Sequence, residues 1–366
     1  MERGVRRAPV GGAAGARRAS RRHEGFMTDE RPSGLGRIIS LLAAAALLVL
    51  ASACQPDRPL DGEGGAKRRP LRFSHGYWVG YFPLSIAEEK GFFDQQGVDV
   101  ELVFNTDLYG MISDFTAGKV DGLPWTMDVV VRVLAKEPDV RVVLYSGQTA
   151  GADVIMARPG IEAVADLKGK KIAAKTGAMG EMLVGEMLER HGLALDDVTL
   201  VNTRETDVAS HLLNDTVQAG HTWEPYVTQV AKAGAKALFS SKETPGLFAD
   251  FTLFRGAVVR ERPDEIRAFL RAWFQAVDYW KAHPEEGNEI IARALKIPVG
   301  DISTEGYELF TLEEVRRRFA PGVDPTWLMP LVSKHVDFLI QDGQLGRRPD
   351  IKEVFDSSFL PPAVSP

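Results

Sequence analysis

The chain has 366 residues and a formal charge of −6. This negative balance, without a Lys/Arg cluster interleaved with aromatic residues, argues against nucleic acid as a partner. The single cysteine, Cys54, excludes a disulfide framework and a cysteine-based zinc or iron–sulfur site, and we predict no cofactor and no metal.

The first 54 residues predict an N-terminal extension followed by an export signal. Residues 1–37 are rich in Arg and Gly, and Ile38–Ala53 is an uncharged apolar run of 16 residues. That run is shorter than the roughly 20 residues of a bilayer-spanning helix and suits a signal peptide. The small residues before Cys54 resemble a bacterial lipobox, which implies a lipid on Cys54 that anchors the chain to a membrane. An uncleaved membrane anchor is the alternative, and Met27 is an alternative start.

Beyond Cys54 the chain becomes more acidic, with 35 basic and 46 acidic residues and a formal charge near −11. Residues 55–70 are polar and rich in Gly and Pro, as expected of a flexible tether. The folded body is predicted to begin near Leu71, which leaves about 295 residues, enough for two lobes.

Short apolar runs then alternate with amphipathic stretches that end in Gly, a pattern typical of strands feeding helices in a mostly parallel sheet. The expected strands are 71–75, 98–104, Gly122, 140–145, 153–157, 171–174, 198–202, 219–222 and 251–255. The expected helices are 83–90, 108–117, 128–135, 179–191, 206–214 and 225–233. Beyond Pro263 only helices are expected, at 265–281, 284–295 and 325–341, packed back on one lobe.

Five segments occur in an order that is specific as a set, although each is weak alone. They are Leu84–Phe93, Gly97–Glu101, Ala165–Ile172, Thr222–Tyr226 and Leu238–Leu247. Behind a lipobox, this set resembles the nitrate/taurine/sulfonate class of ABC importer solute-binding proteins, which are related to thiamine-pyrimidine precursor binders. The resemblance covers nearly all of 71–360.

The resemblance implies an α/β chain with a type II periplasmic-binding-protein fold, in which two crossings join two lobes and a helical C-terminal extension follows. Lobe 1 is expected at 71–157 plus 250–366, and lobe 2 at 158–249. The crossings are expected near 157–160 and 246–252, where closure around a ligand would be absorbed.

Candidate ligand-binding residues lie where strands end and helices begin, since ligands of parallel sheets bind there. They are Tyr77, Trp78, Trp125, Thr126, Asp128, Gly151, Asp153, Thr176, Gly177, Ala178, Met179, Trp223 and Glu224. Structural alternatives stay open, because Tyr77 and Trp78 suit core packing, Asp128 suits a helix N-cap, and Thr176–Gly180 suits a tight turn. At Thr203–Asp207 the capping explanation is favoured.

The polar candidates point to the class of ligand. Backbone donors after Lys175 suit an anionic group, whereas Asp128, Asp153 and Glu224 suit an amine. We therefore expect a sulfonate- or taurine-like zwitterion, or an amine-bearing heterocycle such as a pyrimidine precursor. An inorganic anion fits less well, because Lys175 and Arg204 are the only basic residues at these junctions.

These features predict a non-catalytic, monomeric importer component, lipid-anchored on the periplasmic or cell-surface side, that delivers a small molecule to an ABC permease and its ATPase. One alternative is a ligand-sensing adaptor for a membrane receptor. A second is a same-fold enzyme of pyrimidine-precursor metabolism, whose cysteine-rich iron-binding stretch this chain lacks. A hydrolase is disfavoured, because His221 and Glu224 are fewer than the three ligands of a catalytic zinc and no nucleophile elbow or P-loop occurs.

Overall fold

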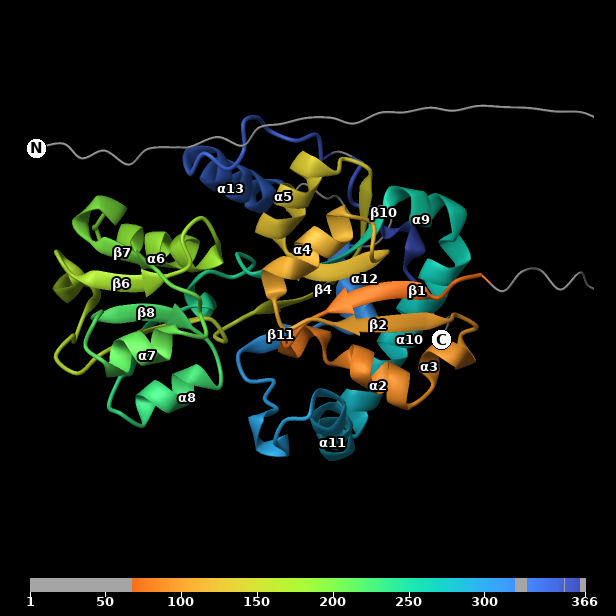
Figure 1. Ribbon diagram of the computed structural model, residues 1–366, viewed down its shortest axis with the longest axis horizontal. Coiled ribbons are helices and arrows are strands. Elements are labelled where there is room, and N and C mark those ends of the chain that lie inside the picture. The colour runs from red at the N-terminus through yellow and green to blue at the C-terminus, as the bar shows by residue number, and fades with distance from the viewer. Residues whose placement is uncertain (1–67, 320–327, 352, 363–366) are drawn as a thin grey trace, which may run out of the picture. The chain divides into compact units, whose positions relative to one another are not determined.

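The computed structural model describes residues 68–319, 328–351 and 353–362 (Figure 1). The predicted export signal, the lipid site at Cys54 and most of the predicted tether lie outside these residues. Among the residues described, no helix combines the length and the apolar character needed to cross a membrane.

The first lobe is built on a six-stranded sheet in the order β11-β4-β10-β3-β1-β2. Its strands are β1 (Leu71–His75), β2 (Val100–Phe104), β3 (Gly122–Thr126), β4 (Val140–Thr149), β10 (Ala249–Arg255) and β11 (Tyr307–Leu309). Its helices are α2 (Pro83–Glu89), α3 (Phe92–Gln95), α4 (Leu108–Thr116), α5 (Met127–Lys136), α9 (Gly256–Glu261), α10 (Pro263–Ala282), α11 (Pro284–Leu295), α12 (Leu312–Phe319) and α13 (Leu328–Gln341). Proline at the first turn of α2, α10 and α11 helps to set where these helices begin.

The second lobe is built on a five-stranded sheet in the order β7-β6-β8-β5-β9. Its strands are β5 (Val154–Ala157), β6 (Lys171–Ala174), β7 (Thr199–Asn202), β8 (Ala219–Thr222) and β9 (Lys236–Ser240). Its helices are α6 (Met179–Arg190), α7 (Val208–Leu213) and α8 (Tyr226–Ala231). Alternating side chains of β5 enter two different cores, Ile155 the one beside α6 and Val154 the one beside α7 and α8, so both faces of this sheet are buried.

The core of the first lobe is rich in aromatic rings. Phe269 of α10 packs on Phe73 of β1 at 4.7 Å between ring centroids, on Phe254 at 5.5 Å and on Phe93 at 5.6 Å. Burial of one such ring stabilises the fold by roughly 2 to 3 kcal/mol. The long helix α10 is therefore packed firmly against the six-stranded sheet.

Both sheets are mixed rather than mostly parallel. In the first, β10 runs antiparallel to both β3 and β4, and β11 runs antiparallel to β4. In the second, β5 runs antiparallel to both β8 and β9. The prediction that only helices follow Pro263 is wrong at β11, which has three residues, too few for a periodic signal.

The chain crosses between the lobes earlier than expected. The sequence assigns residues 153–157 to the first lobe, but β5 pairs with β8 and β9 of the second sheet. The first crossing therefore lies at 150–153, between the end of β4 and the start of β5, and the second at 241–248. Periodicity predicted the strand correctly, but it carries no information about which sheet the strand joins.

Helix α13 contacts both lobes, whereas the sequence placed this helix on one. Leu331 and Phe338 pack against the cores of both lobes, and the buried Nε2–H of His335 donates to the carbonyl of Leu247 at 3.1 Å. Burial lowers the pKa of His335 to about 4, so this imidazole is neutral at pH 7. The C-terminal helix thus adds a packed contact between lobes to the two chain crossings.

Candidate functional site

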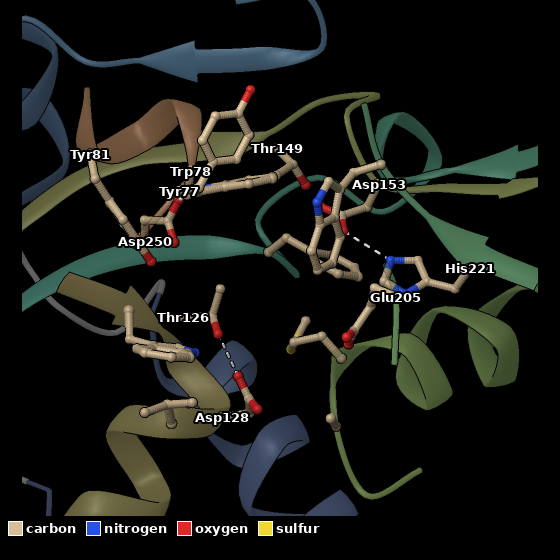
Figure 2. Close-up of a pocket in the computed structure, with 16 residues that line it drawn as sticks. Tyr77, Trp78, Tyr81, Thr126, Asp128, Thr149, Asp153, Glu205, His221 and Asp250 are labelled. Atoms are coloured by element: carbon tan, nitrogen blue, oxygen red, sulfur yellow. Dashed lines mark hydrogen bonds and ion pairs between the residues drawn. The ribbon is translucent and has the colours of Figure 1, made fainter. Parts of the chain in front are cut away.

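A cavity of about 100 Å³ lies between the two sheets, and residues of both lobes line it (Figure 2). This space suits one small organic molecule and is too small for a folded partner. The lining residues are Tyr77, Trp78, Tyr81, Trp125, Thr126, Asp128, Val129, Thr149, Asp153, Ala178, Met179, Glu205, His221, Trp223, Phe248 and Asp250.

Strand ends position most of these side chains. Tyr77 and Trp78 follow β1, Trp125 and Thr126 end β3, and Trp223 follows β8. Parallel strands bring their carboxyl ends to one edge of a sheet, so residues far apart in the chain meet there.

Aromatic rings from the two lobes meet across the cavity. Trp78 of the first lobe packs edge-on against Trp223 of the second, with ring centroids 5.9 Å apart. Trp78 also meets Tyr307 of β11 at 5.8 Å, with the ring planes at 90°. These edge-to-face contacts hold the indole of Trp78 in one orientation and form a flat apolar wall.

Asp250 of β10 is the most deeply buried carboxylate that lines the cavity, with 1% of its surface exposed. Its Oδ2 accepts hydrogen bonds from Nε1 of Trp78 at 2.9 Å and from the hydroxyl of Tyr307 at 2.7 Å. Its Oδ1 has no hydrogen-bond partner among the described residues. Burial raises the pKa of Asp250 to about 7, and the two donors only partly oppose that rise.

Two glycines make room for the Tyr307 hydroxyl beside this carboxylate. A Cβ atom on Gly80 would lie 2.3 Å from Oη of Tyr307, and one on Gly147 would lie 2.7 Å from the same atom. Any larger residue at either position would push the ring away from Asp250. The local sequence thus fixes the hydrogen bonds on Oδ2 and leaves Oδ1 free.

Asp153 and His221 form a buried pair on the second-lobe side of the cavity. Nε2 of His221 lies 2.9 Å from Oδ1 of Asp153, and because a carboxylate only accepts, the Nε2–H donates. Nδ1 of His221 has no partner among the described residues and faces Gly180 of α6. Asp153, which immediately precedes the apolar strand β5, therefore has a fixed hydrogen-bond donor.

Two further carboxylates complete the lining. Asp128, in the first turn of α5, accepts from the hydroxyl of Thr126 at 2.5 Å and lies 3.5 Å from Nη2 of Arg132. Thr126 is the N-cap of α5, so the predicted capping alternative for Asp128 does not apply. Burial raises the pKa of Glu205, while the charge of Lys175 acts in the opposite direction. Figure 2 shows Thr126, Asp128 and Asp250 facing Asp153, His221 and Glu205.

Nine of the thirteen ligand-binding candidates line this cavity. They are Tyr77, Trp78, Trp125, Thr126, Asp128, Asp153, Ala178, Met179 and Trp223. The four that do not are Gly151, Thr176, Gly177 and Glu224.

Each of these four positions is accounted for elsewhere in the structure. The N–H of Gly151 donates to Oγ of Ser241 at 2.8 Å, and Glu224 accepts from the backbone and hydroxyl of Thr228 in α8. The carboxylate of Glu224 is thus bound to Thr228, whereas His221 is bound to Asp153. Thr176 and Gly177 line a second hollow, which shares Val129 and Ala178 with the cavity.

That hollow also contains Lys175 and Arg132. The N–H of Gly177 donates to Glu181 at 2.7 Å, and its carbonyl accepts from Arg132 and from Gln344. The backbone at Gly177 therefore already has protein partners, contrary to the expectation that it offers free donors to a ligand.

Seven lining residues were not among the candidates. They are Tyr81, Val129, Thr149, Glu205, His221, Phe248 and Asp250. Asp250 and His221 carried a usable signal, because each is an ionisable residue in a strand that is buried at most of its positions. Glu205 lies in the junction that was assigned to capping, whereas nothing in the sequence separates Tyr81 or Phe248 from core residues.

A metal site is not evident here, since no cluster of three or more His, Cys, Asp or Glu side chains suited to a metal occurs in the described part of the chain. The cavity instead combines aromatic walls with carboxylates, an arrangement suited to binding an organic molecule.

Comparison with known proteins gives evidence that is independent of the cavity's geometry. A family model described as "NMT1/THI5 like" matches residues 78–287. A Bacillus subtilis protein named "Putative aliphatic sulfonates-binding protein" is 26% identical over 333 residues, which cover 88% of this chain and 96% of that protein. The crystal structure of the periplasmic aliphatic sulphonate binding protein SsuA from Escherichia coli matches with a TM-score of 0.65 at 17% identity, over 79% of this chain and 92% of that one. The predicted periplasmic-binding-protein fold is confirmed.

Relatives of the chain also include proteins named as enzymes. The 4-amino-5-hydroxymethyl-2-methylpyrimidine phosphate synthase THI11 of Saccharomyces cerevisiae is 26% identical over 220 residues. That match covers 56% of this chain and 64% of the yeast protein, a smaller share of both than for the Bacillus subtilis relative. The likeness therefore extends further along the binding protein than along the synthase.

Proposed function

The chain belongs to the NMT1/THI5-like family, and we propose that it is the extracytoplasmic solute-binding component of an ABC importer. The observation that carries this proposal is the cavity between the two sheets, whose walls come from both lobes. A ligand held by both lobes favours the closed arrangement, and a permease can distinguish that arrangement from the open one.

The crossings at 150–153 and 241–248 are the proposed hinge. Both are short segments between strands of different sheets, so a rotation there keeps the strand pairing within each sheet. Trp78 and Trp223 lie on opposite sides of this hinge, and their ring contact supports closure around the ligand. We also propose that residues 1–54 direct export and that a lipid on Cys54 anchors the chain, which acts as a monomer.

A binding role is favoured over catalysis by the chemistry of the lining. The chain's one cysteine, Cys54, precedes the described residues, so no thiol nucleophile lines the cavity. His221 is held by Asp153, but no lining hydroxyl is hydrogen-bonded to its Nδ1 as a nucleophile would be. The proposed cycle leaves the ligand chemically unchanged.

The direct test is to purify the full chain from its native host and identify the copurifying small molecule by mass spectrometry. Calorimetry with that molecule then compares the wild type with Trp223→Ala. We expect the loss of this ring to weaken binding by roughly 1 to 3 kcal/mol. Phe104→Ala is the matched control, because Phe104 is an exposed aromatic residue on β2 outside the cavity.

An unchanged dissociation constant in Trp223→Ala would remove this ring from the site. A copurifying molecule that is recovered chemically altered after incubation with the protein would replace the transport proposal with an enzymatic one.

A further inference from the structure

Asp250 has one occupied and one free carboxylate oxygen. Both of its hydrogen bonds, from Trp78 and Tyr307, end on Oδ2, whereas Oδ1 is unpaired among the described residues. A buried acceptor without a donor costs roughly 1 to 3 kcal/mol, so a fold keeps one where something else completes it. Oγ1 of Thr149 is a second buried atom of the lining without a partner.

The other carboxylates that line the cavity have a basic group close by. Asp128 lies 3.5 Å from Arg132, and Asp153 accepts a hydrogen bond from the Nε2–H of His221. Lys175 and His221 act on Glu205 through their charges. By contrast, both donors to Asp250 are neutral, and the carboxylates Asp153 and Asp128 only add negative charge near it.

The cavity as a whole favours positive charge. Four carboxyl groups line it, and no Lys or Arg belongs to that lining among the described residues. Five of the other lining residues are Tyr or Trp, and the negative face of such rings attracts cations by about 0.5 to 2 kcal/mol. A sulfonate in this space would face the four carboxyl groups at a low effective dielectric.

Given the proposed function, we infer that the ligand is a compact organic cation, an ammonium or amidinium, whose charged nitrogen donates a hydrogen bond to Oδ1 of Asp250. The rings of Trp78 and Trp223 cover the apolar part of the ligand.

Three probes with the same ring and different charge test the inference. Benzamidine is a cation, benzamide is its neutral counterpart and benzenesulfonate is an anion. Binding is followed by the fluorescence of the cavity tryptophans in the full-length protein near pH 8. We expect saturable binding of benzamidine, at least about tenfold weaker binding of benzamide, and no binding of benzenesulfonate.

Two substitutions locate the interaction. Asp250→Asn keeps the shape but removes the charge, and we expect it to weaken benzamidine binding by about tenfold or more. Tyr307→Phe keeps the charge but removes one donor to Oδ2, and we expect a smaller loss of about threefold. Glu101→Gln is the matched control, a carboxylate-to-amide change at an exposed position on β2 that leaves binding unchanged.

The pH dependence of the wild type gives a readout that does not depend on the folding of a variant. The pKa of Asp250 lies near 7, and the carboxyl must ionise to hold a cation. Its immediate neighbours are Trp78 and Tyr307, with Asp153 and Asp128 acting through their charges. We expect benzamidine affinity to fall up to about tenfold per pH unit below about 7, with uptake of the ligand releasing a proton there.

Any one of three results would overturn this inference. They are tighter binding of benzenesulfonate than of benzamidine, failure of benzamidine to bind, and an unchanged benzamidine affinity in Asp250→Asn. The proposed function fails separately. An anionic molecule that copurifies unaltered would leave the transport role standing and remove the cation, whereas a ligand that is chemically altered would remove the transport role itself.

Discussion

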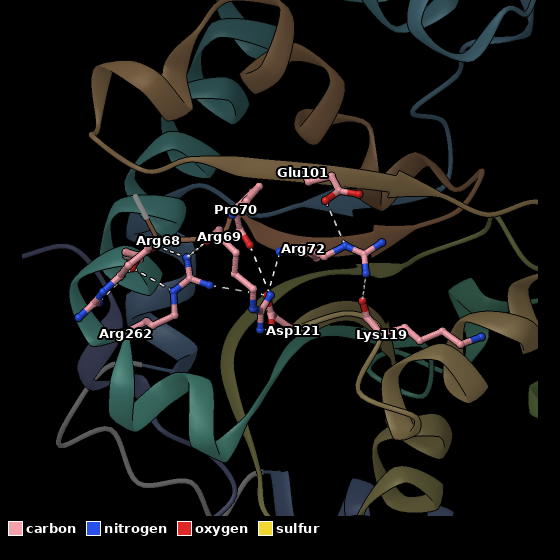
Figure 3. Close-up of polar contacts among 9 residues, drawn as sticks. Arg68, Arg69, Pro70, Arg72, Glu101, Lys119, Asp121 and Arg262 are labelled. Atoms are coloured by element: carbon pink, nitrogen blue, oxygen red, sulfur yellow. Dashed lines mark hydrogen bonds and ion pairs between the residues drawn. The ribbon is translucent and has the colours of Figure 1, made fainter. Parts of the chain in front are cut away.

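Two aspartates of the first lobe are equally buried, but they differ in how far hydrogen-bond donors and positive charges compensate their carboxylates. Asp121 and Asp250 are each 1% exposed. Asp121 accepts two hydrogen bonds from the guanidinium of Arg69, at 2.6 and 2.7 Å, and one from the backbone N–H of Arg72 at 2.9 Å (Figure 3). Arg262 lies 3.8 Å from the same carboxylate. Asp250 receives two neutral donors on one oxygen and none on the other.

Their positions in the sheet explain the difference. Asp121 immediately precedes β3, whereas Asp250 of β10 is paired with Thr126 at the carboxyl end of β3. The two carboxylates therefore lie at opposite ends of one strand. Ligands bind beyond the carboxyl ends of parallel strands, and the other end is free to serve stability. Asp121 thus has the full set of donors expected of a structural carboxylate, whereas Asp250 keeps a free oxygen at the end of the sheet where ligands bind.

The cluster around Asp121 also corrects the predicted tether. The sequence extended this tether to residue 70, but Arg69 binds Asp121, and the guanidinium of Arg262 donates to the backbone carbonyl of Arg69 at 2.9 Å. Arg68 lies 3.4 Å from Glu265 of α10. The chain is therefore attached to the first lobe from residue 68, three residues before β1 begins.

The largest expected effect on the free energy of unfolding comes from replacing Asp121, the compensated carboxylate. We expect Asp121→Ala to lower the free energy of unfolding by about 3 kcal/mol, because Arg262 and the N–H of Arg72 lose their buried partner. Urea unfolding followed by circular dichroism measures the change, with ligand binding as a second readout. If Asp121→Ala abolished binding in a protein of wild-type stability, the assignment of the two roles would be reversed.

Removing the charge of Asp250 is expected to change the free energy of unfolding in the opposite direction. Its carboxyl has a pKa of about 7 in the fold against 3.8 in the unfolded chain. Protonation is thus favoured in the folded state, so this group's contribution to stability is complete below about pH 4 and is lost as pH rises to about 7. We expect Asp250→Asn to raise the free energy of unfolding of the ligand-free protein by about 2 kcal/mol at pH 8 and to have little effect at pH 4.

Urea titrations of wild type and Asp250→Asn at several pH values give that difference directly. A loss of stability at pH 8 in Asp250→Asn would mean that Asp250 stabilises the fold as Asp121 does. The two aspartates would then have the same structural role.

The smallest effect is expected at an exposed ion pair next to the Asp121 cluster. Nε of Arg72 lies 3.1 Å from Glu101, and both side chains are more than one-third exposed. Such pairs are screened by water and salt, so we expect Glu101→Gln to change the free energy of unfolding by less than about 0.5 kcal/mol. A loss as large as that in Asp121→Ala would mean that burial does not decide what a carboxylate contributes here.

The sequence predicted the fold well where local periodicity was strong. The strands at 71–75, 171–174 and 219–222 and the helix at 284–295 begin and end where predicted. The failures have a common cause. The sheet membership of β5 and the pairing of β11 depend on hydrogen bonds to strands far away in the chain, which no local pattern encodes.

The residues of the candidate site likewise include some that could be selected from the sequence and some that could not. Trp78, Trp223 and Asp153 could be selected from the sequence, because an aromatic or charged residue at the junction of a strand is conspicuous. Glu224 was equally conspicuous, but its carboxylate accepts hydrogen bonds from Thr228 in the helix that follows, α8. Asp250 was not selected, although its burial and its free oxygen make it central to the proposed chemistry.

By itself the amino-acid sequence determined the α/β class, the resemblance to importer binding proteins and most of the aromatic wall, because these depend on residue type and on spacing along the chain. Only the tertiary structure decided which carboxylates are compensated and which is left with a free oxygen. That distinction depends on the donors that other strands and helices bring within hydrogen-bonding distance, and such donors have no fixed separation in sequence.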